Sequence, residues 1–451
     1  MEESPLLQEL IARTAGEDVF RQAAEEVFDS VKVVLERNQT YRRLKLFERM
    51  LEPERLVSFR VTWLDDAGEV QVNRGYRVQM NSALGPYKGG LRFSPFVTQA
   101  ELKFLAFEQT FKNALTRLPL GGGKGGADFN PKGKSETEVM RFCQNFMLEL
   151  KRHIGPYTDV PAGDIGVGGR EIGYLFGMYK KLHNEFTGVI TGKDPIWGGS
   201  KIRTEATGYG LVFFAEFMLQ EQNDTLAGKR CLVSGAGNVA QYTLEQLLKQ
   251  GAIPVTVSDS SGYIYDEAGI DKKKLAFILR LKNGERGGIS AYAEEYPESV
   301  FTPADAEAGY NPLWQHPADC AFPCATQNEI NARDAQHLAD NGVRLLAEGA
   351  NMPLTHEALA VIQQSGIRYA PGKAANAGGV AVSGLEMTQN RQGVYWSRVK
   401  AEDRLRGIMR QIHDTSLHTA KEYGQPGNYA AGANIAGFLR VAEAMVAQGV
   451  V

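Results

Sequence analysis

The spacing of hydrophobic positions changes from helical to strand-like within the first eighty residues. Apolar residues recur at intervals of three and four over Phe20–Leu35, which is the spacing of one face of an α-helix. Apolar and polar residues then alternate over Val57–Trp63 and again over Val70–Val78, on either side of the turn-forming Asp65–Gly68. This pattern predicts a helix followed by a β-hairpin.

Two capping-box sequences predict further helices in the first half of the chain. One helix is expected over Thr98–Leu115 and another over Ser135–Arg152, because each starts with a hydroxyl residue that Glu follows three positions later. Gln109 and Lys112 are three positions apart on the first helix and therefore share a face. After the second helix, a glycine-rich loop is expected to carry Asp164.

The second half predicts a βαβ unit. A helix is expected over Thr204–Leu219, a short buried strand over Arg230–Ser234, a helix ending near Gln250 and a second strand over Pro254–Asp259. The turn over residues 235–240 reads Gly-Ala-Gly-Asn-Val-Ala, a dinucleotide-binding fingerprint with alanine in the third glycine position. Its glycines let the backbone approach a pyrophosphate, which the helix N-terminus attracts. The alternative is a tight turn in an unrelated α/β sheet.

The residues after this unit leave the choice of dinucleotide open. An acid that ends the second strand, here Asp259, accepts hydrogen bonds from a ribose 2′-hydroxyl and favours NAD. The serines around it, together with Lys282 and Arg286, could instead bind the 2′-phosphate of NADP.

Lys124 is the leading candidate for chemistry, because it stands among five glycines in Gly121–Gly126. A lysine that is partly desolvated and near other cations should lose proton affinity and become a usable general base. The alternative is a solvated surface turn. The segment is not a Walker-type phosphate loop, since neither Ser nor Thr follows the lysine.

Glycine makes up 49 of the 451 residues, about 11% against the usual ~7%. The excess is clustered in segments that we expect to be loops, where a scaffold usually carries its chemistry. The clusters are 85–92, 121–126, 163–169, 198–199, 235–237 and 372–384.

The composition limits the class of protein. A chain of 451 residues should form two domains, and a net charge of −3 argues against nucleic acid or an anionic membrane as the main partner. No apolar run approaches a membrane span, and Met1–Pro5 lacks the features of a signal peptide. Four cysteines and seven histidines show neither a disulfide framework nor metal-ligand spacing. We therefore expect a reduced cytoplasmic protein without a metal.

Seven segments together resemble the hexameric glutamate dehydrogenases of bacteria and fungi, within the larger group of Glu/Leu/Phe/Val dehydrogenases. They are Pro86–Phe93, Gly121–Gly126, Pro161–Gly166, Gly235–Ala240, Pro323–Glu329, Ala347–Pro353 and Pro371–Val380. The resemblance covers nearly the whole chain. The length of the chain and the segment Ser258–Ser261 are similar to those of the NADP-dependent branch.

The resemblance implies an α/β fold of two domains with the active site in the cleft between them. Residues 1–202 would form an α/β domain for substrate binding and oligomerisation, and residues 203–426 a doubly wound, Rossmann-like dinucleotide-binding domain. Residues 427–451 would form a C-terminal helix that packs back on the first domain. Hinge closure would exclude water from the cleft.

The resemblance also assigns roles in the reversible oxidative deamination of L-glutamate to 2-oxoglutarate and ammonium. Lys124 would activate the water that attacks the imine, and Asp164 would carry protons to and from the substrate amine. The residues expected to bind the substrate are Lys88 and Ser383 at the γ-carboxylate, Gln109 and Lys112 at the α-carboxylate, and Gly163 beside Asp164.

NADP(H) is the expected cofactor, and a homohexamer the expected assembly. The residues implied for cofactor binding are Lys132, Thr207, Gly235, Gly237, Asn238, Val239, Asp259, Lys282, Arg286, Asn351 and Asn376. No metal ligand is implied.

Three alternatives remain open. The first is a glutamate dehydrogenase specific for NAD. The second is a dehydrogenase for leucine, valine or phenylalanine, against which Lys88 argues, because an apolar pocket would leave its ammonium buried and unpaired. The third is a dinucleotide-binding regulatory subunit without catalysis, against which the presence of both Lys124 and Asp164 argues.

Overall fold

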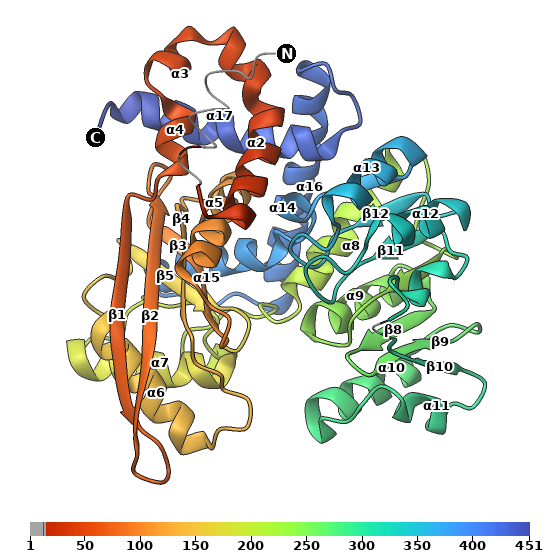
Figure 1. The fold of residues 1–451 in the computed structure, drawn as a ribbon, viewed down its shortest axis with the longest axis horizontal. Coiled ribbons are helices and arrows are strands. Elements are labelled where there is room, and N and C mark those ends of the chain that lie inside the picture. Colours follow the sequence, from red (N-terminus) through yellow and green to blue (C-terminus); the bar gives the residue numbers. More distant parts are fainter. Residues whose placement is uncertain (1–11, 13–14, 306) are drawn as a thin grey trace. The chain divides into compact units, whose positions relative to one another are not determined.

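The computed structural model describes residue 12, residues 15–305 and residues 307–451, and its contacts divide the chain into two compact units (Figure 1). The expectation for Met1–Pro5 lies outside the described residues. The first unit comprises residues up to Arg203, Val380–Ala401 and Ala431–Val451, and the second comprises Thr204–Gly379 and Glu402–Ala430. Residues 380–401, which the sequence prediction gave to the dinucleotide-binding domain, thus belong with the first unit.

The first unit is built on a mixed five-stranded sheet in the order β1-β2-β4-β3-β5. β1 pairs antiparallel with β2, and β2 antiparallel with β4, whereas β3 pairs parallel with both β4 and β5. The expected hairpin is confirmed as β1 and β2. The strands are β1 (Arg55–Leu64), β2 (Val70–Asn81), β3 (Tyr87–Phe93), β4 (Gly122–Ala127) and β5 (Asp159–Gly163).

The helices of the first unit follow the predicted periodicity. The first expected helix is confirmed as α2, whose buried face includes Phe20, Ala24, Val27, Val31 and Leu35. Parts of α15, α16 and α17 belong to this unit as well. The helices are α2 (Asp18–Arg37), α3 (Gln39–Arg43), α4 (Leu46–Leu51), α5 (Gln99–Leu115), α6 (Glu136–Leu150), α7 (Gly169–His183), the 3₁₀ turn η1 (Pro195–Trp197), α15 (Gly378–Gln392), α16 (Arg398–Glu422) and α17 (Tyr429–Gln448).

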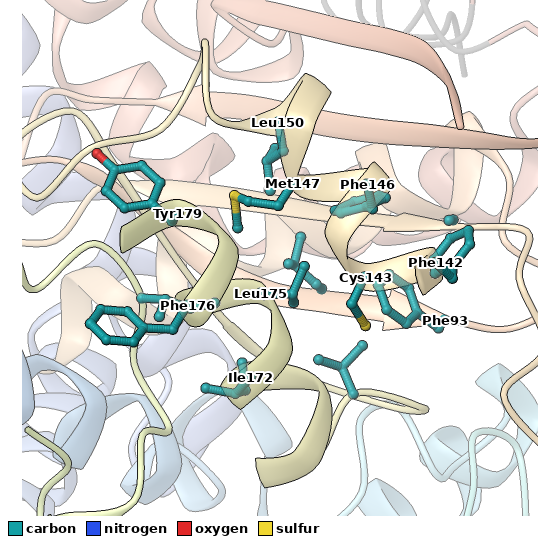
Figure 2. Packing of buried hydrophobic residues seen from close by; sticks show 14 of the residues in the cluster. Phe93, Phe142, Cys143, Phe146, Met147, Leu150, Ile172, Leu175, Phe176 and Tyr179 are labelled. Atoms are coloured by element: carbon teal, nitrogen blue, oxygen red, sulfur yellow. The ribbon is translucent and has the colours of Figure 1, made fainter. Parts of the chain in front are cut away.

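A core rich in aromatic rings holds α6 and α7 against the sheet (Figure 2). Phe142 of α6 stacks on Phe129 with a centroid distance of 3.8 Å, and its edge contacts Phe93 of β3 at 5.1 Å. Such ring pairs stabilise a core beyond the apolar area that they bury. Because Phe93 is the last residue of β3, this packing also fixes the end of the strand that carries Lys88 and Arg92.

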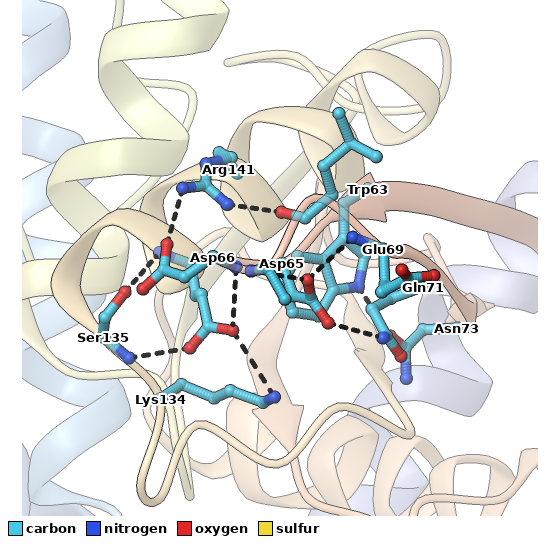
Figure 3. A network of polar contacts seen from close by, with 12 residues as sticks. Trp63, Asp65, Asp66, Glu69, Gln71, Asn73, Lys134, Ser135 and Arg141 are labelled. Atoms are coloured by element: carbon cyan, nitrogen blue, oxygen red, sulfur yellow. Dashed lines mark hydrogen bonds and ion pairs between the residues drawn. The ribbon is translucent and has the colours of Figure 1, made fainter.

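The tip of the hairpin is tied to the start of α6 by polar contacts (Figure 3). Arg141 donates to Asp66 at 2.6 Å and to the carbonyl oxygen of Leu64 at 2.5 Å. Ser135 and Glu138 form the predicted reciprocal capping box at the same helix end. The contacts of Arg141 are exposed, so they orient the turn more than they stabilise it.

The second unit contains the predicted parallel sheet, in the order β13-β12-β11-β6-β7, and a three-stranded antiparallel sheet, in the order β10-β9-β8. All strand pairs of the five-stranded sheet are parallel. The strands are β6 (Arg230–Val233), β7 (Ile253–Pro254), β8 (Thr256–Asp259), β9 (Gly262–Tyr265), β10 (Val300–Pro303), β11 (Cys320–Phe322), β12 (Leu345–Ala347) and β13 (Arg368–Ala370).

The single strand expected over Pro254–Asp259 is wrong, because this stretch divides between two sheets. Ile253–Pro254 pairs with β6, whereas Thr256–Asp259 pairs with β9. The Thr256 hydroxyl accepts from Val233 N at 2.8 Å and donates to Val233 O at 3.0 Å. The Thr256 side chain thereby replaces backbone pairing between β8 and β6, and the backbone of β8 pairs with β9 instead.

Helices flank these strands along the chain. The helix predicted over Thr204–Leu219 is confirmed as α8, and the helix of the fingerprint as α9. The helices are α8 (Ala206–Gln220), α9 (Asn238–Lys249), α10 (Lys272–Leu279), the π-helical turn η2 (Arg280–Glu285), α11 (Ala291–Glu295), η3 (Pro312–Gln315), α12 (Ala332–Asp340), α13 (His356–Ser365) and α14 (Gly372–Ala375).

Two of the glycine clusters are strands rather than loops. Residues 85–92 largely form β3, residues 121–126 form most of β4, and both strands are almost entirely buried. Glycine is needed there because neighbouring backbone lies too close for a side chain. A Cβ on Gly89 would lie 1.6 Å from the carbonyl oxygen of Gly123, and one on Gly122 would lie 2.0 Å from Thr110 Oγ1.

One helix is apolar enough to resemble a membrane span. In the described part of the chain, α17 alone meets that test by length and composition, with a mean hydropathy of 1.2, and 56% of the tested window is buried. A buried core helix has the same composition, and Arg440 and Glu443 interrupt the apolar sequence of α17. All four cysteines are free and buried. Among the described residues, no group of His, Cys, Asp and Glu is placed to hold a metal.

Candidate functional site

Lys124 projects from the middle of β4, in a strand whose glycines let β2, β3 and α5 pack close to its backbone. A Cβ on Gly125 would lie 2.7 Å from the carbonyl oxygen of Tyr76. The Lys124 side chain is only 6% exposed. The glycines therefore place the lysine in a closely packed sheet, where the alternative of a solvated surface turn does not apply.

The ammonium of Lys124 lies 3.1 Å from Oδ2 of Asp164, which follows the end of β5. Arg92 of β3 donates from Nε to the same oxygen at 2.9 Å and from Nη1 to Glu101 Oε1 at 2.5 Å. Asp164 also lies close to the backbone of β3, since a Cβ on Gly90 would lie 2.8 Å from Asp164 Cβ. Lys124 and Asp164, far apart in the sequence, are thus brought into contact.

Burial and charge set the protonation of this pair. Burial lowers the pKa of Lys124, and Arg92 lowers it further, against the opposing effect of Asp164. Burial alone would raise the pKa of Asp164, but Lys124 and Arg92 outweigh it and bring the pKa to about 2. The carboxylate is therefore ionised at neutral pH, and the lysine gives up its proton more readily than a solvated lysine does.

Lys88 is a second buried lysine, 1% exposed, on β3. Its ammonium donates to Thr191 Oγ1 at 2.8 Å and to the carbonyl oxygen of Pro161 at 3.4 Å, and neither is a charged oxygen. Burial lowers its pKa well below the ordinary value, and Arg203 and Arg77 add to the effect. Within the described residues this cation has no carboxylate directly on its amine.

Ser383, the expected partner of Lys88, accepts a hydrogen bond from Nε of Arg203 at 2.9 Å. Arg203 is the last residue of the first stretch of this unit, and burial lowers the pKa of its guanidinium. Lys88 and Ser383 are not bonded to each other in the described structure. Arg203 provides an electrostatic link between them, since it contacts Ser383 and lowers the pKa of Lys88.

Gln109 on α5 is held by a neighbouring asparagine. Gln109 donates from Nε2 to Asn113 Oδ1 at 2.7 Å, and Asn113 donates to the carbonyl oxygens of Lys88 and Gly121. Lys112 is half-buried on the same helix. Gly163 ends β5, where a Cβ would lie 2.4 Å from the carbonyl oxygen of Val167. Asn113 thus ties α5 to β3 and to the residue that precedes β4.

Sequence reasoning missed three side chains around these lysines: Arg92, Thr191 and Arg203. Arg92 stands in the motif Pro86–Phe93, so its segment was recognised without a role for its guanidinium. Thr191 and Arg203 lie outside any recognisable motif. Their contacts depend on segments that only the folded chain brings together.

The fingerprint in the second unit forms a tight glycine turn between β6 and α9. Gly235 has φ of +81°, and a Cβ there would lie 3.0 Å from the carbonyl oxygen of Cys324. Its N–H donates to Ser258 Oγ at 2.7 Å, which ties the turn to β8. Gly237 is the N-cap of α9, without a side-chain cap, so the amides that begin the helix at Asn238 and Val239 are available to an anion.

Asp259 is already neutralised within the second unit. It accepts from Lys282 Nζ at 2.7 Å, and from the backbone N–H groups of Ser261 and Ile289 at 2.8 Å each. Although burial opposes it, these contacts lower the pKa of Asp259. Arg286 is exposed, with φ of +56°, at the end of the π-helical turn. Lys132 is exposed in the first unit.

Asn376 provides a buried amide that fits a polar ligand. Its Nδ2 donates to the carbonyl oxygen of Ala350 at 3.1 Å and to Asn351 Oδ1 at 3.2 Å, while its buried Oδ1 has no partner among the described residues. Thr207 lies in the first turn of α8, and Asn238 donates to the carbonyl oxygen of Thr204 at 2.6 Å. A buried acceptor without a partner is compatible with a ligand that carries an amide donor.

Comparison with known proteins identifies the family. Residues 198–449 match the Glutamate/Leucine/Phenylalanine/Valine dehydrogenase model, and residues 53–181 match the Glu/Leu/Phe/Val dehydrogenase dimerisation domain. The chain belongs to the Glu/Leu/Phe/Val dehydrogenase family. The resemblance stated from the motifs is thereby confirmed, and so is the two-domain α/β fold.

Relatives match over almost the full length. An NADP-specific glutamate dehydrogenase of Giardia intestinalis is 56% identical over 99% of each chain. An NAD(P)-specific glutamate dehydrogenase of Xylanibacter ruminicola is 53% identical over 100% of each. The crystal structure of Plasmodium falciparum glutamate dehydrogenase superposes with a TM-score of 0.95 at 48% identity, covering 98% of this chain and 94% of that one.

Proposed function

We propose that the protein is an NADP-dependent glutamate dehydrogenase, which interconverts L-glutamate with 2-oxoglutarate and ammonium. The relatives named above support the reaction. Lys88 is the observation that carries the choice of substrate within the family. A buried ammonium bonded to neutral oxygens is compensated by an anionic substrate group, whereas a leucine or phenylalanine side chain would leave it uncompensated.

In this proposal, the first unit binds the two carboxylates of the substrate at opposite ends. Lys88 and Ser383 hold the γ-carboxylate, with Arg203 adding charge beside Ser383. Gln109 and Lys112 hold the α-carboxylate from α5, next to Gly163. The substrate α-carbon then lies between these anchors, near Lys124 and Asp164, which are in contact.

The protein's part in the chemistry is proton transfer. NADP in its oxidised form, when bound, would supply the nicotinamide ring that takes the hydride of the glutamate α-carbon. Lys124, whose lowered pKa favours loss of its proton, would act as the base that takes a proton from the water attacking the imine. Asp164 receives and returns the amine proton as the carbon–nitrogen bond breaks and ammonia leaves.

NADP is favoured over NAD because Asp259 is already paired. Its contact with Lys282 leaves less negative charge to repel a 2′-phosphate. Arg286, and Lys132 from the first unit, would add positive charge. Gly235, Gly237, Asn238 and Val239 would bind the pyrophosphate. Asn351 and Asn376, with Thr207, would bind the nicotinamide end.

We further propose that the enzyme is a cytoplasmic homohexamer, with no role for nucleic acid or membrane. The match of residues 53–181 to a dimerisation domain supports an oligomer. Light scattering on the purified chain would measure its mass. A mass of one 49.5 kDa chain would refute the oligomer while leaving the reaction untouched.

One assay tests the proposed reaction. The purified chain, without any partner subunit, should oxidise NADPH with 2-oxoglutarate and ammonium, and NADH more slowly at equal concentration. Replacing 2-oxoglutarate by 4-methyl-2-oxopentanoate should reduce the rate strongly. Faster turnover with the branched substrate would favour a leucine dehydrogenase, and no turnover with any pair would favour a regulatory subunit.

A further inference from the structure

We propose that Arg92 is a positioning residue of the reaction, which holds Asp164 by one carboxylate oxygen and thereby leaves the other oxygen to the substrate amine. The inference rests on the proposed glutamate dehydrogenase activity. Both Arg92 Nε and Lys124 Nζ contact Oδ2 of Asp164, at 2.9 Å and 3.1 Å. Oδ1 has no hydrogen bond within the described residues.

The backbone around Arg92 makes this geometry rigid. β3 lies between β4 and β5, with Arg92 opposite Gly126 and Leu91 opposite Gly163. A Cβ on Gly126 would lie 2.1 Å from the carbonyl oxygen of Arg92. Phe93 N donates to the carbonyl oxygen of Ile165 at 2.9 Å, which fixes the turn just after Asp164. β3 therefore fixes both the backbone next to Asp164 and the Asp164 side chain.

Glu101 is the second carboxylate that the Arg92 guanidinium contacts, besides Asp164. The sequence predicts that Glu101 completes a capping box with Thr98, but only half of that box forms. Thr98 accepts from the Glu101 N–H at 3.2 Å, whereas the Glu101 carboxylate binds Arg92. Its second oxygen, Oε2, is buried and has no partner in the part of the chain that the structure describes. A residue suited to capping α5 is instead used to hold Arg92, whose side chain is 11% exposed.

The permanent charge of Arg92 acts on both members of the pair that it contacts. A guanidinium stays protonated throughout the working pH range, whereas Lys124 must lose its proton to act as a base. Burial is the main cause of the lowered pKa of Lys124, and Arg92 lowers it further. Together with Lys124, Arg92 also lowers the pKa of Asp164. Arg92 therefore keeps Asp164 ionised at the moment when Lys124 becomes neutral.

Three variants separate its charge from its shape. In Arg92→Gln both are lost, so we expect kcat for glutamate oxidation to fall at least ~10-fold and the acidic limb of the pH profile to move up by ~1 pH unit, because Lys124 holds its proton more tightly. In Arg92→Lys the charge remains, but a single nitrogen replaces the separate Nε and Nη1 donors that reach Asp164 and Glu101, so the geometry of both contacts changes. Here kcat should fall while the limb stays within ~0.3 pH unit of wild type. Glu101→Gln should lower kcat less than Arg92→Gln does.

Arg141→Gln is the matched control, because it also removes an arginine of the first unit that bridges two groups (Figure 3). Its pH profile should match wild type. An unshifted limb in Arg92→Gln, or wild-type kcat in both Arg92 variants, would overturn the inference. If Arg92→Gln does not fold, wild-type kcat in Arg92→Lys overturns it alone. An inactive wild type would instead refute the proposed function.

Discussion

At the scale of single residues, the site consists of charges that the fold keeps away from water. Lys88, Lys124 and Arg203 are cations whose pKa values are lowered, first by burial. Asp164 is the carboxylate that contacts one of them directly. A site with more buried positive than negative charge is suited to a dicarboxylate, and without one the uncompensated charge destabilises the folded protein.

The role of Lys124 leads to the first prediction. Lys124→Ala should abolish turnover, because no other side chain is proposed to deprotonate the attacking water. Binding of NADPH, measured by fluorescence titration, should remain within about threefold of wild type, since the fingerprint belongs to the other unit. A kcat near the wild-type value would refute the assigned role.

The role of Asp164 leads to the second. Asp164→Asn keeps the shape of the side chain but removes its charge, so kcat should fall by at least ~10²-fold, the lower range for a positioned acid or base. The KM for glutamate should change little. Loss of glutamate binding with an unchanged kcat would make Asp164 an electrostatic anchor instead.

Lys88 leads to a third prediction, on substrate choice. In Lys88→Leu combined with Ser383→Val, the anchors of the γ-carboxylate are gone, while an apolar side chain loses nothing there. The ratio of kcat/KM for glutamate to that for leucine should therefore fall by ~10²-fold or more. An unchanged ratio would place the γ-carboxylate elsewhere.

The single variant Lys88→Leu should also be more stable than wild type without substrate. Because the pKa of Lys88 is lowered by folding, the unfolded wild-type chain binds a proton more tightly, and wild-type stability falls as pH drops below 10.5. The gain in melting temperature on substitution should consequently be larger at pH 7 than at pH 10. Thermal unfolding at both pH values measures it, and a gain that grows with pH would contradict this account.

At the scale of elements, the periodic segments could be predicted and the glycine segments could not. α2, the hairpin and α6 follow from spacing and capping, which are local properties. β3 and β4 carry so much glycine that they have the composition of loops. Their glycines are needed because neighbouring strands and α5 lie too close for side chains, and a single sequence does not show such packing.

The site followed the same division between local and distant information. Lys124 and Asp164 could be found because glycine-rich motifs mark them. Arg203 could not, since its contact with Ser383 joins positions 180 residues apart. The diversion of Glu101 from capping to Arg92 could not be read either, because the capping pattern is the same in both cases.

At the scale of the whole molecule, two units each carry part of one reaction, and cofactor choice depends on charge rather than on the shape of the fingerprint. The turn at Gly235 would serve either dinucleotide. The decision falls to Asp259 and to the cations around it. The Lys282 ammonium donates to Asp259 at 2.7 Å and to the carbonyl oxygen of Gly287 at 2.8 Å. Its first effect is therefore to neutralise a carboxylate that would repel a phosphate.

The last prediction follows from this cancellation. Replacing Lys282 and Arg286 by Ala exposes Asp259 and removes the proposed phosphate ligands, so KM for NADPH should rise ~10-fold or more, with little change for NADH. The effect should be larger at low salt. Arg280→Ala is the control, because Arg280 lies on the same π-helical turn but pairs with Glu285 in solvent. Asp259→Asn in the same background should recover part of the loss, since the exposed charge is then gone. Equal weakening of both cofactors, or a wild-type kcat/KM that is higher with NADH, would show that these side chains do not select NADP.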